Sequence, residues 1–161
     1  RMESRYFPFF IDMTGKKVLV AGAGSIALRR VSALLRFGAV ITVVAPQMRE
    51  EFQKLQQQYG TEHLHLEQKT CDPEQVTDYD LVLTATDSGE TDQRIWEACK
   101  MHHVWVNVAS DQTLCDFRFP ALAETEELVV GITSNNGDHR KVRKVSAQIR
   151  EVLETENYNL E

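Results

Sequence analysis

The chain has 161 residues, 42% hydrophobic and 26% charged, a balance typical of one folded domain with at most a small appendage and not of a disordered chain. Its 18 lysines and arginines against 24 aspartates and glutamates give a net charge of −6, which argues against broad binding of nucleic acid. Since no apolar run approaches the roughly 20 residues that a spanning helix needs, we expect no membrane segment.

The first two thirds of the chain alternate short apolar runs with segments of helical periodicity. This alternation is typical of strand–helix–strand units, which build a parallel sheet that helices cover on both faces. The predicted elements, in chain order, are strands at 16–21, 40–45, 63–68, 81–85 and 104–108, and helices at 25–37, 48–58 and 90–102, with a short helix capped at Asp72.

After about residue 111 this rhythm changes. Phe117 and Phe119 alternate before Pro120, and another apolar run follows at 128–133, so we expect a hairpin or two extended arms. A last helix is expected at 140–154. Its predicted apolar stripe consists of Val142, Val145, Ile149, Val152 and Leu153.

A hairpin and one amphipathic helix bury little apolar surface by themselves. The segment therefore packs against a second copy of the chain or folds back on its own sheet. We expect the first arrangement, a homodimer formed largely by residues from 112 onward.

Residues 22–27 match the pattern G-x-G-x-x-G/A, directly after the first predicted strand and at the start of the first predicted helix. Gly22 permits a tight turn, Gly24 lets the backbone approach a diphosphate, and Ala27 is small enough for the helix to pack closely on the strand. The amides at the helix start favour phosphate charge. We therefore expect a Rossmann-type α/β fold that binds NAD through Gly22, Ala23, Gly24, Ser25, Ile26 and Ala27.

Two other strand ends add candidate contacts. At the end of the second strand, where an acidic residue normally binds the ribose hydroxyls, the sequence reads Ala-Pro-Gln at 45–47, with Arg49 close by, so the choice between NAD and NADP stays open. The fourth strand ends in Thr-Ala-Thr-Asp at 84–87, which is either a cofactor contact or an ordinary helix cap. The additional candidates for cofactor binding are Ala45, Pro46, Thr84, Thr86 and Asp87.

Several short motifs follow one another in a definite order: YFPFFID at 6–12, VLVAGAG at 18–24, ALRR at 27–30, TVVAP at 42–46, ATD at 85–87, VNVA at 106–109 and CDFRFPA at 115–121. Together they resemble the siroheme synthase N-terminal family, the precorrin-2 dehydrogenases. The resemblance implies NAD-dependent oxidation of precorrin-2 to sirohydrochlorin, a homodimer and, in some members, metal insertion into the product. It also implies a further helical domain beyond residue 150, of which this chain has little.

Two positions depart from the family pattern. Members that perform both reactions carry an Asp where this chain has Ser110, and Asp111 stands beside it. Asp111 and Ser110 are the candidate catalytic residues, with Asp111 assisting the proton transfer or serving only as a turn residue. Some members without chelatase activity also have Ser there, so metal insertion stays open. The family's Gly-Gly-x-Ser-Pro turn is replaced at 134–139 by Ser-Asn-Asn-Gly-Asp-His.

A tetrapyrrole substrate carries several carboxylates, and an acidic protein must gather positive charge to bind it. Residues 140–144 supply four cations at the start of the last helix, either as a carboxylate-binding patch or as a solvated face. The candidate substrate contacts are Arg118, Arg140 and Lys141.

The three cysteines, Cys71, Cys99 and Cys115, are odd in number and far apart, so we expect neither a disulfide framework nor a zinc ribbon. His63 and His65 share a strand face without a third ligand, and we expect no structural metal. The charged N-terminus lacks the apolar core of a signal peptide, and a reducing cytoplasm fits these features.

The sequence thus predicts an NAD-binding Rossmann domain at 1–111 and a dimerisation segment at 112–161, which together act as a precorrin-2 dehydrogenase. One alternative is a non-catalytic module of the same fold that senses NAD, because a fold does not determine a function. Another is an ordinary dehydrogenase for a smaller substrate, although no large substrate domain follows the nucleotide-binding part.

Overall fold

The computed structural model describes residues 4–160, so residues 1–3 of the charged N-terminal segment and residue 161 lie outside the described part. The chain forms two compact units. The larger runs from Ile11 to Phe117, and the smaller combines the segment ending at Phe10 with the segment beginning at Arg118. The units thus divide after Phe117, whereas the sequence prediction placed a boundary after residue 111 and assigned the N-terminal segment to the first domain.

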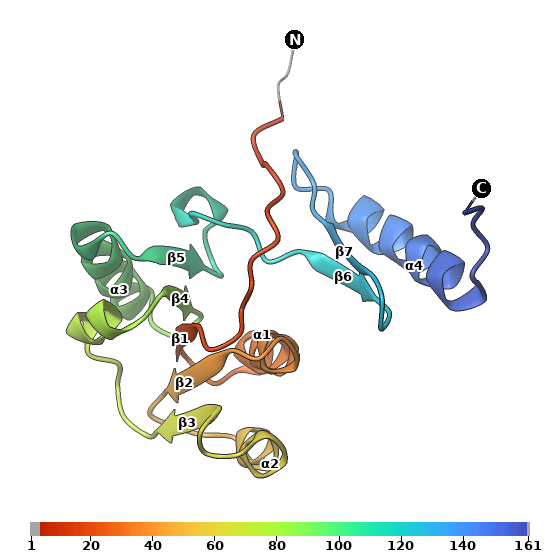
Figure 1. Ribbon diagram of the computed structural model, residues 1–161. Coiled ribbons are helices and arrows are strands. Elements are labelled where there is room, and N and C mark those ends of the chain that lie inside the picture. Colours follow the sequence, from red (N-terminus) through yellow and green to blue (C-terminus); the bar gives the residue numbers. More distant parts are fainter. Residues whose placement is uncertain (1–3, 161) are drawn as a thin grey trace. The chain divides into compact units, whose positions relative to one another are not determined.

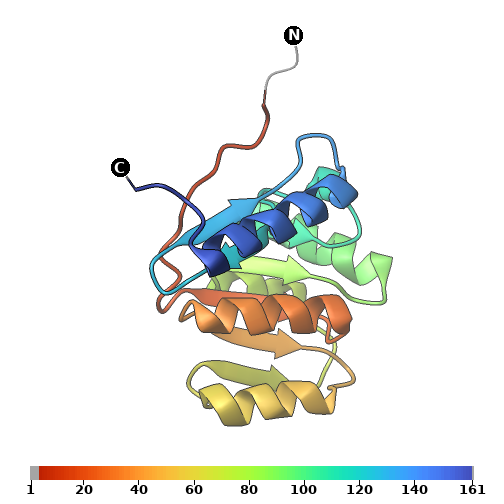
Figure 2. The ribbon, with the colours of Figure 1, turned by 90° about the vertical axis from the view of Figure 1, so that its right-hand side faces the viewer.

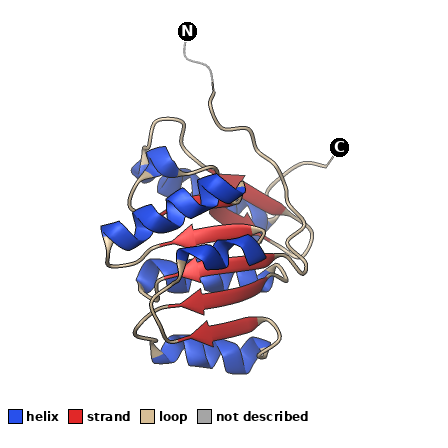
Figure 3. Ribbon diagram, turned by 90° about the vertical axis from the view of Figure 1, so that its left-hand side faces the viewer, coloured by secondary structure: helices blue, strands red, loops and turns tan. Residues whose placement is uncertain are grey.

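The larger unit is built on a five-stranded sheet with the order β3-β2-β1-β4-β5, whose arrows point the same way (Figure 3). Its strands are β1 (Lys17–Ala21), β2 (Val40–Val44), β3 (Leu64–Glu67), β4 (Leu81–Thr84) and β5 (Trp105–Val108). Every pair of neighbouring strands is parallel. The predicted parallel sheet is therefore confirmed, and the carboxyl ends of its strands share one edge.

Helices cover both faces of this sheet. Helices α1 (Ser25–Arg36) and α2 (Glu50–Tyr59) lie on one face, and α3 (Gly89–His102) lies on the other with the 3₁₀ helix η1 (Pro73–Asp78) (Figure 1). Because β1 is covered on both faces, all its residues after Lys17 are buried. A second 3₁₀ helix, η2 (Gln112–Leu114), follows β5.

The predicted bounds of these elements differ from the observed ones by one or two residues, as is usual at fraying ends. The short helix capped by Asp72 is a 3₁₀ helix, in which Asp72 accepts a hydrogen bond from the Glu74 amide at 3.0 Å. On α1 the residues Ala27, Val31 and Leu35 are buried as their spacing predicts.

The smaller unit contains an antiparallel hairpin of β6 (Ala121–Glu124) and β7 (Val129–Ile132), and α4 (His139–Thr155) lies along β6 (Figure 2). The Arg150 guanidinium donates to the Leu122 carbonyl at 3.0 Å and ties α4 to the hairpin. The expected hairpin is present, but its first strand begins after Pro120 and does not include Phe117 and Phe119. A proline lacks the N–H that a strand ladder needs, so pairing starts with Ala121.

The predicted apolar stripe of α4 is only partly covered. Ser146 is the one described residue of α4 that is buried, whereas the side chains of Val145 and Val152 are 37% and 39% exposed. Leu128 and Val129 on the hairpin are exposed to a similar degree, 44% and 41%. A single copy of this unit therefore leaves apolar surface in water, which costs free energy in proportion to its area.

A buried amide connects three parts of the larger unit. Asn107 on β5 is 4% exposed, its Oδ1 accepts from the Arg30 guanidinium at 2.8 Å, and its Nδ2 donates to the Phe117 carbonyl at 2.9 Å. Burial lowers the pKa of Arg30, so the acceptor oxygen of Asn107 helps to compensate for a partly desolvated cation. This amide fixes α1, β5 and the end of the unit relative to one another.

Replacement of Asn107→Ala should lower the free energy of unfolding by about 1–3 kcal/mol, because both hydrogen bonds are lost inside the protein. Urea denaturation measures this change. The exposed substitution Gln57→Ala on α2 serves as the control and should change the free energy by less than about 0.5 kcal/mol. Equal effects of the two substitutions would show that the Asn107 bonds do not matter for stability.

Candidate functional site

The order of the strands defines one position on the sheet edge where a ligand is expected. From β1 the chain proceeds to β2 and β3 on one side, and it then crosses to β4 and β5 on the other side. In open parallel sheets, ligands bind outside the carboxyl ends of the strands where the strand order reverses. Here that point lies between β1 and β4.

Gly22 brings these two strands close together. It is buried with φ +105°, and a Cβ at this position would lie 2.3 Å from the Ala85 carbonyl oxygen. Its amide donates to the Val44 carbonyl at 2.9 Å and so also connects the turn to β2. Because a positive φ and a main-chain clash both exclude a side chain, only glycine fits this position.

The start of α1 is open to solvent. Gly24 is its N-cap residue, no side chain caps the helix, and its first turn contains no acidic residue. A Cβ built on Gly24 meets nothing within 4 Å, and Ser25 and Ile26 are exposed. The amides of a helix N-terminus lack partners within the helix and attract anions, so these residues fit the diphosphate of a dinucleotide.

Besides Gly22, three residues of the predicted cofactor set are buried. Ala27 is 1% exposed and packs in the core, as its predicted packing role requires. Ala45 is 3% exposed, and its amide donates to the Glu67 carbonyl, so at the end of β2 the exposed residues are Pro46 and Gln47. Thr84 is fully buried, which corrects its interpretation as a cofactor contact: its side chain points into the protein because it lies on a central strand.

The loop after β4 is organised by a residue that the sequence analysis did not identify. Asp92 on α3 is 5% exposed and accepts hydrogen bonds from the hydroxyls of Thr84 and Thr86 at 2.6 and 2.7 Å. Thr86 is half-buried, and Asp87 is exposed at the same edge of the sheet. The signal for Asp92 was present, because it lies three residues before the buried Ile95 and thus on the inner side of its helix.

The loop after β5 carries both candidate catalytic residues. Ser110 is exposed in the turn, and the Asp111 carboxylate accepts from the hydroxyl and the amide of Thr113 at 2.6 and 2.9 Å. These two hydrogen bonds hold the pKa of Asp111 below its usual value. Asp111 is therefore ionised at neutral pH. Its carboxylate caps η2, as it would if Asp111 served only as a turn residue.

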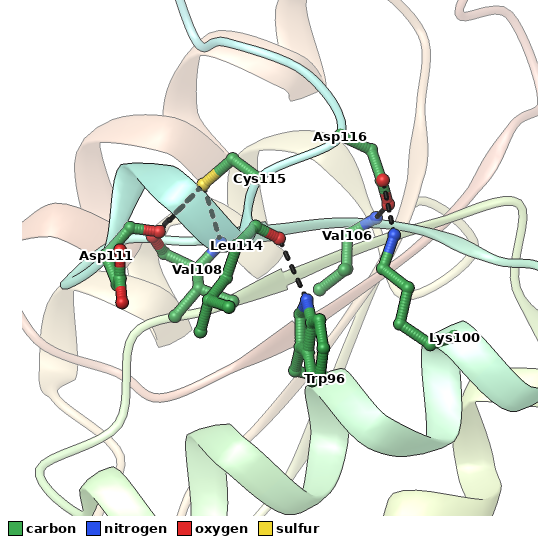
Figure 4. Close-up of polar contacts among 8 residues, drawn as sticks. All are labelled: Trp96, Lys100, Val106, Val108, Asp111, Leu114, Cys115 and Asp116. Atoms are coloured by element: carbon green, nitrogen blue, oxygen red, sulfur yellow. Dashed lines mark hydrogen bonds and ion pairs between the residues drawn. The ribbon is translucent and has the colours of Figure 1, made fainter.

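Side chains around this loop fix it to the rest of the larger unit (Figure 4). The sulfur of Cys115 lies 3.2 Å from the Val108 carbonyl and 3.4 Å from the Asp111 carbonyl. The Trp96 indole donates to the Leu114 carbonyl at 3.0 Å, and Lys100 pairs with Asp116. The main chain at 110–116 is thus held by both α3 and β5.

The candidate substrate contacts all belong to the smaller unit. The guanidinium of Arg118 lies over the Tyr6 ring, 4.4 Å from its centroid, and donates to the Tyr6 hydroxyl, while its Nε is buried without a hydrogen-bond partner. Arg140 and Lys141 are exposed at the start of α4. The Asp138 carboxylate accepts from the Lys141 amide at 2.9 Å and offsets the unfavourable placement of cations at a helix N-terminus.

Two cysteines lie in the core. Burial raises the pKa of Cys71 to about 11 and that of Cys99 to about 12, so both thiols stay protonated at neutral pH and are poor nucleophiles. Within residues 4–160, no group of three or more His, Cys, Asp or Glu side chains is arranged to hold a metal ion. The described part of the chain also contains no helix that is long and apolar enough to cross a membrane.

A glycine turn and an uncapped helix start at the reversal point of a parallel sheet define a dinucleotide-binding α/β domain. Residues 9–121 match the protein family described as putative NAD(P)-binding. The chain belongs to this family, which supports the prediction of a pyridine dinucleotide cofactor.

Comparisons with individual proteins agree with the resemblance seen in the sequence. The chain is 39% identical over 147 residues to a probable multifunctional siroheme biosynthesis protein HemA of Ruminiclostridium josui and 33% identical over 148 residues to a siroheme synthase of Zymomonas mobilis. These alignments cover 91% and 92% of this chain but only 28% and 31% of the two relatives. The predicted relationship to siroheme synthases is confirmed.

A solved structure shares the fold. The precorrin-2 dehydrogenase SirC superposes with a TM-score of 0.74 at 23% identity, over 96% of this chain and 72% of that one. The observed fold is therefore the Rossmann-type fold predicted from the sequence.

The two glycines of the turn should respond differently to substitution. Gly22→Ala should lower the free energy of unfolding by more than about 2 kcal/mol, because of the positive φ and the clash with Ala85. Gly24→Asp has open space around its Cβ and should fold normally, but its carboxylate should abolish NAD binding by repelling the diphosphate. Urea denaturation and titration calorimetry separate the two effects. Undiminished NAD affinity of folded Gly24→Asp would exclude this turn as the diphosphate site.

Proposed function

We propose that this chain is the NAD-dependent dehydrogenase part of a siroheme-forming protein and oxidises precorrin-2 to sirohydrochlorin. The observation that carries the proposal is the open start of α1 beside Gly22, in a chain that aligns over nine tenths of its length with siroheme biosynthesis proteins. Metal insertion into the product is not part of the proposal. The place of action is the cytoplasm.

NAD supplies the hydride acceptor of this reaction. The chain itself binds and orients the two reactants. The amides of Gly24, Ser25 and Ile26 hold the diphosphate, Pro46 borders the adenosine side, and Thr86 and Asp87 contact the nicotinamide side. This placement rests on the strand order: Pro46 follows β2 and Thr86 follows β4, and these two strands lie on opposite sides of β1.

Oxidation also requires the loss of a proton from the tetrapyrrole. Asp111 and Ser110 follow β5, next to β4 at the same edge of the sheet. Asp111 is the proton acceptor in this proposal because it is ionised, and Ser110, whose hydroxyl is exposed, donates a hydrogen bond to the substrate. The low pKa of Asp111 makes it a weak base, so positioning of the two reactants provides most of the rate.

The carboxylates of the substrate require cations. Arg118, Arg140 and Lys141 supply them, and the buried Nε of Arg118 is a donor that a carboxylate can satisfy. In this arrangement residues 1–111 bind NAD and include Ser110 and Asp111, while residues 112–161 supply the cations for the substrate and form the dimer.

A second function is favoured by one observation. The Asp111 carboxylate is already occupied by two hydrogen bonds from Thr113, as a residue with a purely structural role would be. A module that binds NAD without converting a tetrapyrrole therefore remains the alternative function.

Anaerobic mixing of the chain with precorrin-2 and NAD should produce NADH and sirohydrochlorin, which absorbance spectroscopy detects. Asp111→Ala should lower kcat by about 10²-fold or more if it accepts the proton, and Ser110→Ala should have the smaller effect. Binding of NAD without turnover would support the sensing module instead. If both variants kept the kcat of the parent protein, neither residue would have a role in catalysis.

The exposed valines of α4 and the hairpin fit a homodimer, since a second copy would cover them. Sedimentation analysis should give the mass of a dimer. Val145→Glu should shift it to the monomer, because a buried carboxylate without a partner costs several kcal/mol. Glu151→Gln, an exposed change on the same helix, should leave the dimer intact. A monomeric parent protein would contradict the proposal.

A further inference from the structure

The larger unit contains a buried carboxylate, one oxygen of which accepts hydrogen bonds from three neutral donors. One oxygen of Asp92, Oδ1, lies 2.6 Å from the Thr84 hydroxyl, 2.7 Å from the Thr86 hydroxyl and 3.1 Å from the Thr86 amide. Burial of a carboxylate is costly unless hydrogen bonds replace its hydration. Three donors at one oxygen meet this requirement, so the group holds its neighbours firmly in place.

The group that Asp92 holds is the peptide between Ala85 and Thr86. On its other side this peptide meets Gly22, where a Cβ would lie 2.3 Å from the Ala85 oxygen and 3.1 Å from the Thr86 nitrogen. The Ala85 amide donates to the Ala21 carbonyl at 2.8 Å and extends the pairing of β4 with β1. The peptide is therefore enclosed between the glycine turn and the Asp92 carboxylate.

The same network reaches the start of α3. The Thr86 hydroxyl is also 2.9 Å from the Ser88 carbonyl and accepts from the Ser88 amide at 3.2 Å. Ser88 is the N-cap residue of α3 and accepts from the Thr91 amide. Displacement of Asp92 would thus release the whole loop from Ala85 to Ser88, which borders the reversal point between β1 and β4.

We propose that Asp92 is a positioning residue for the dinucleotide: its carboxylate fixes the Ala85–Thr86 peptide against Gly22 and thereby sets the shape of the nicotinamide side of the site. Asp92 is buried and acts through Thr84 and Thr86 rather than by touching the cofactor. This inference rests on the proposed dinucleotide site.

The test measures NAD affinity by titration calorimetry and stability by urea denaturation, on the same preparations. Asp92→Ala should weaken NAD binding by at least about tenfold, and Asp92→Asn, which keeps an acceptor oxygen, should recover most of the affinity. Asp116→Ala is the matched control. Its carboxylate also accepts from a main-chain amide, that of Val106 at 2.9 Å. Val106 lies near the amino end of β5, whereas the proposed site lies at the carboxyl ends of the strands. Asp116→Ala should lower stability and leave NAD affinity within about twofold of the parent.

A second pair of variants guards against poor folding of Asp92→Ala. Thr84 is fully buried, so its hydroxyl reaches the cofactor only through Asp92. Thr84→Val keeps the shape and removes the hydroxyl, and it should weaken NAD binding by about threefold or more, the effect of one lost hydrogen bond. Thr84→Ser should restore the affinity.

The possible failures have different meanings. If the parent protein binds no NAD, the proposed dinucleotide site itself fails. If the parent binds NAD and folded Asp92→Ala or Thr84→Val binds it equally well, the dinucleotide site stands and the positioning role of Asp92 is overturned. An equal loss of affinity in Thr84→Val and Thr84→Ser would also overturn it, because the restored hydroxyl would then have no effect.

Discussion

The close approach of β1 and β4 at Gly22 is the constraint on which the rest of the site depends. With no side chain at this position, the Ala85 carbonyl oxygen can lie 2.3 Å from where a Cβ would be, and the carboxyl ends of the two central strands converge. The chain then turns directly into α1, so the uncapped amides of Gly24, Ser25 and Ile26 stand at the point where the strand order reverses. A larger residue would separate the strands and move the start of the helix.

Two of the acidic residues near this edge of the sheet, Asp92 and Asp111, have different environments and therefore different chemistry. Asp92 is buried, and the hydroxyls and the amide that it accepts from belong to the last residue of β4 and to the loop after it. Asp111 lies at the surface, bonded to Thr113 within its own turn, and its lowered pKa keeps it ionised. The first is suited to holding main chain in place, and the second to meeting a substrate that arrives from solvent.

The smaller unit presents a different physical problem. Its hairpin and α4 bury few residues, while Val145, Val152, Leu128 and Val129 keep more than a third of their surface in water. The helix begins with exposed cations whose electrostatic cost is reduced by the Asp138 cap. Apolar surface for a second copy and cations for an anionic substrate occur together in this unit, which agrees with the functions proposed for residues 112–161.

The sequence by itself determined the alternation of strands and helices, the glycine turn and the relationship to siroheme synthases. These features depend on local periodicity and on short motifs, such as the spacing of Ala27, Val31 and Leu35. Only the tertiary structure decided that Thr84 is buried, that Asp92 holds the loop after β4 and that β6 begins after Pro120. It also joined Tyr6 to Arg118 and moved the division between the units to Phe117. Such outcomes depend on which distant segments pack together, and residue spacing along one segment carries no information about a partner elsewhere in the chain.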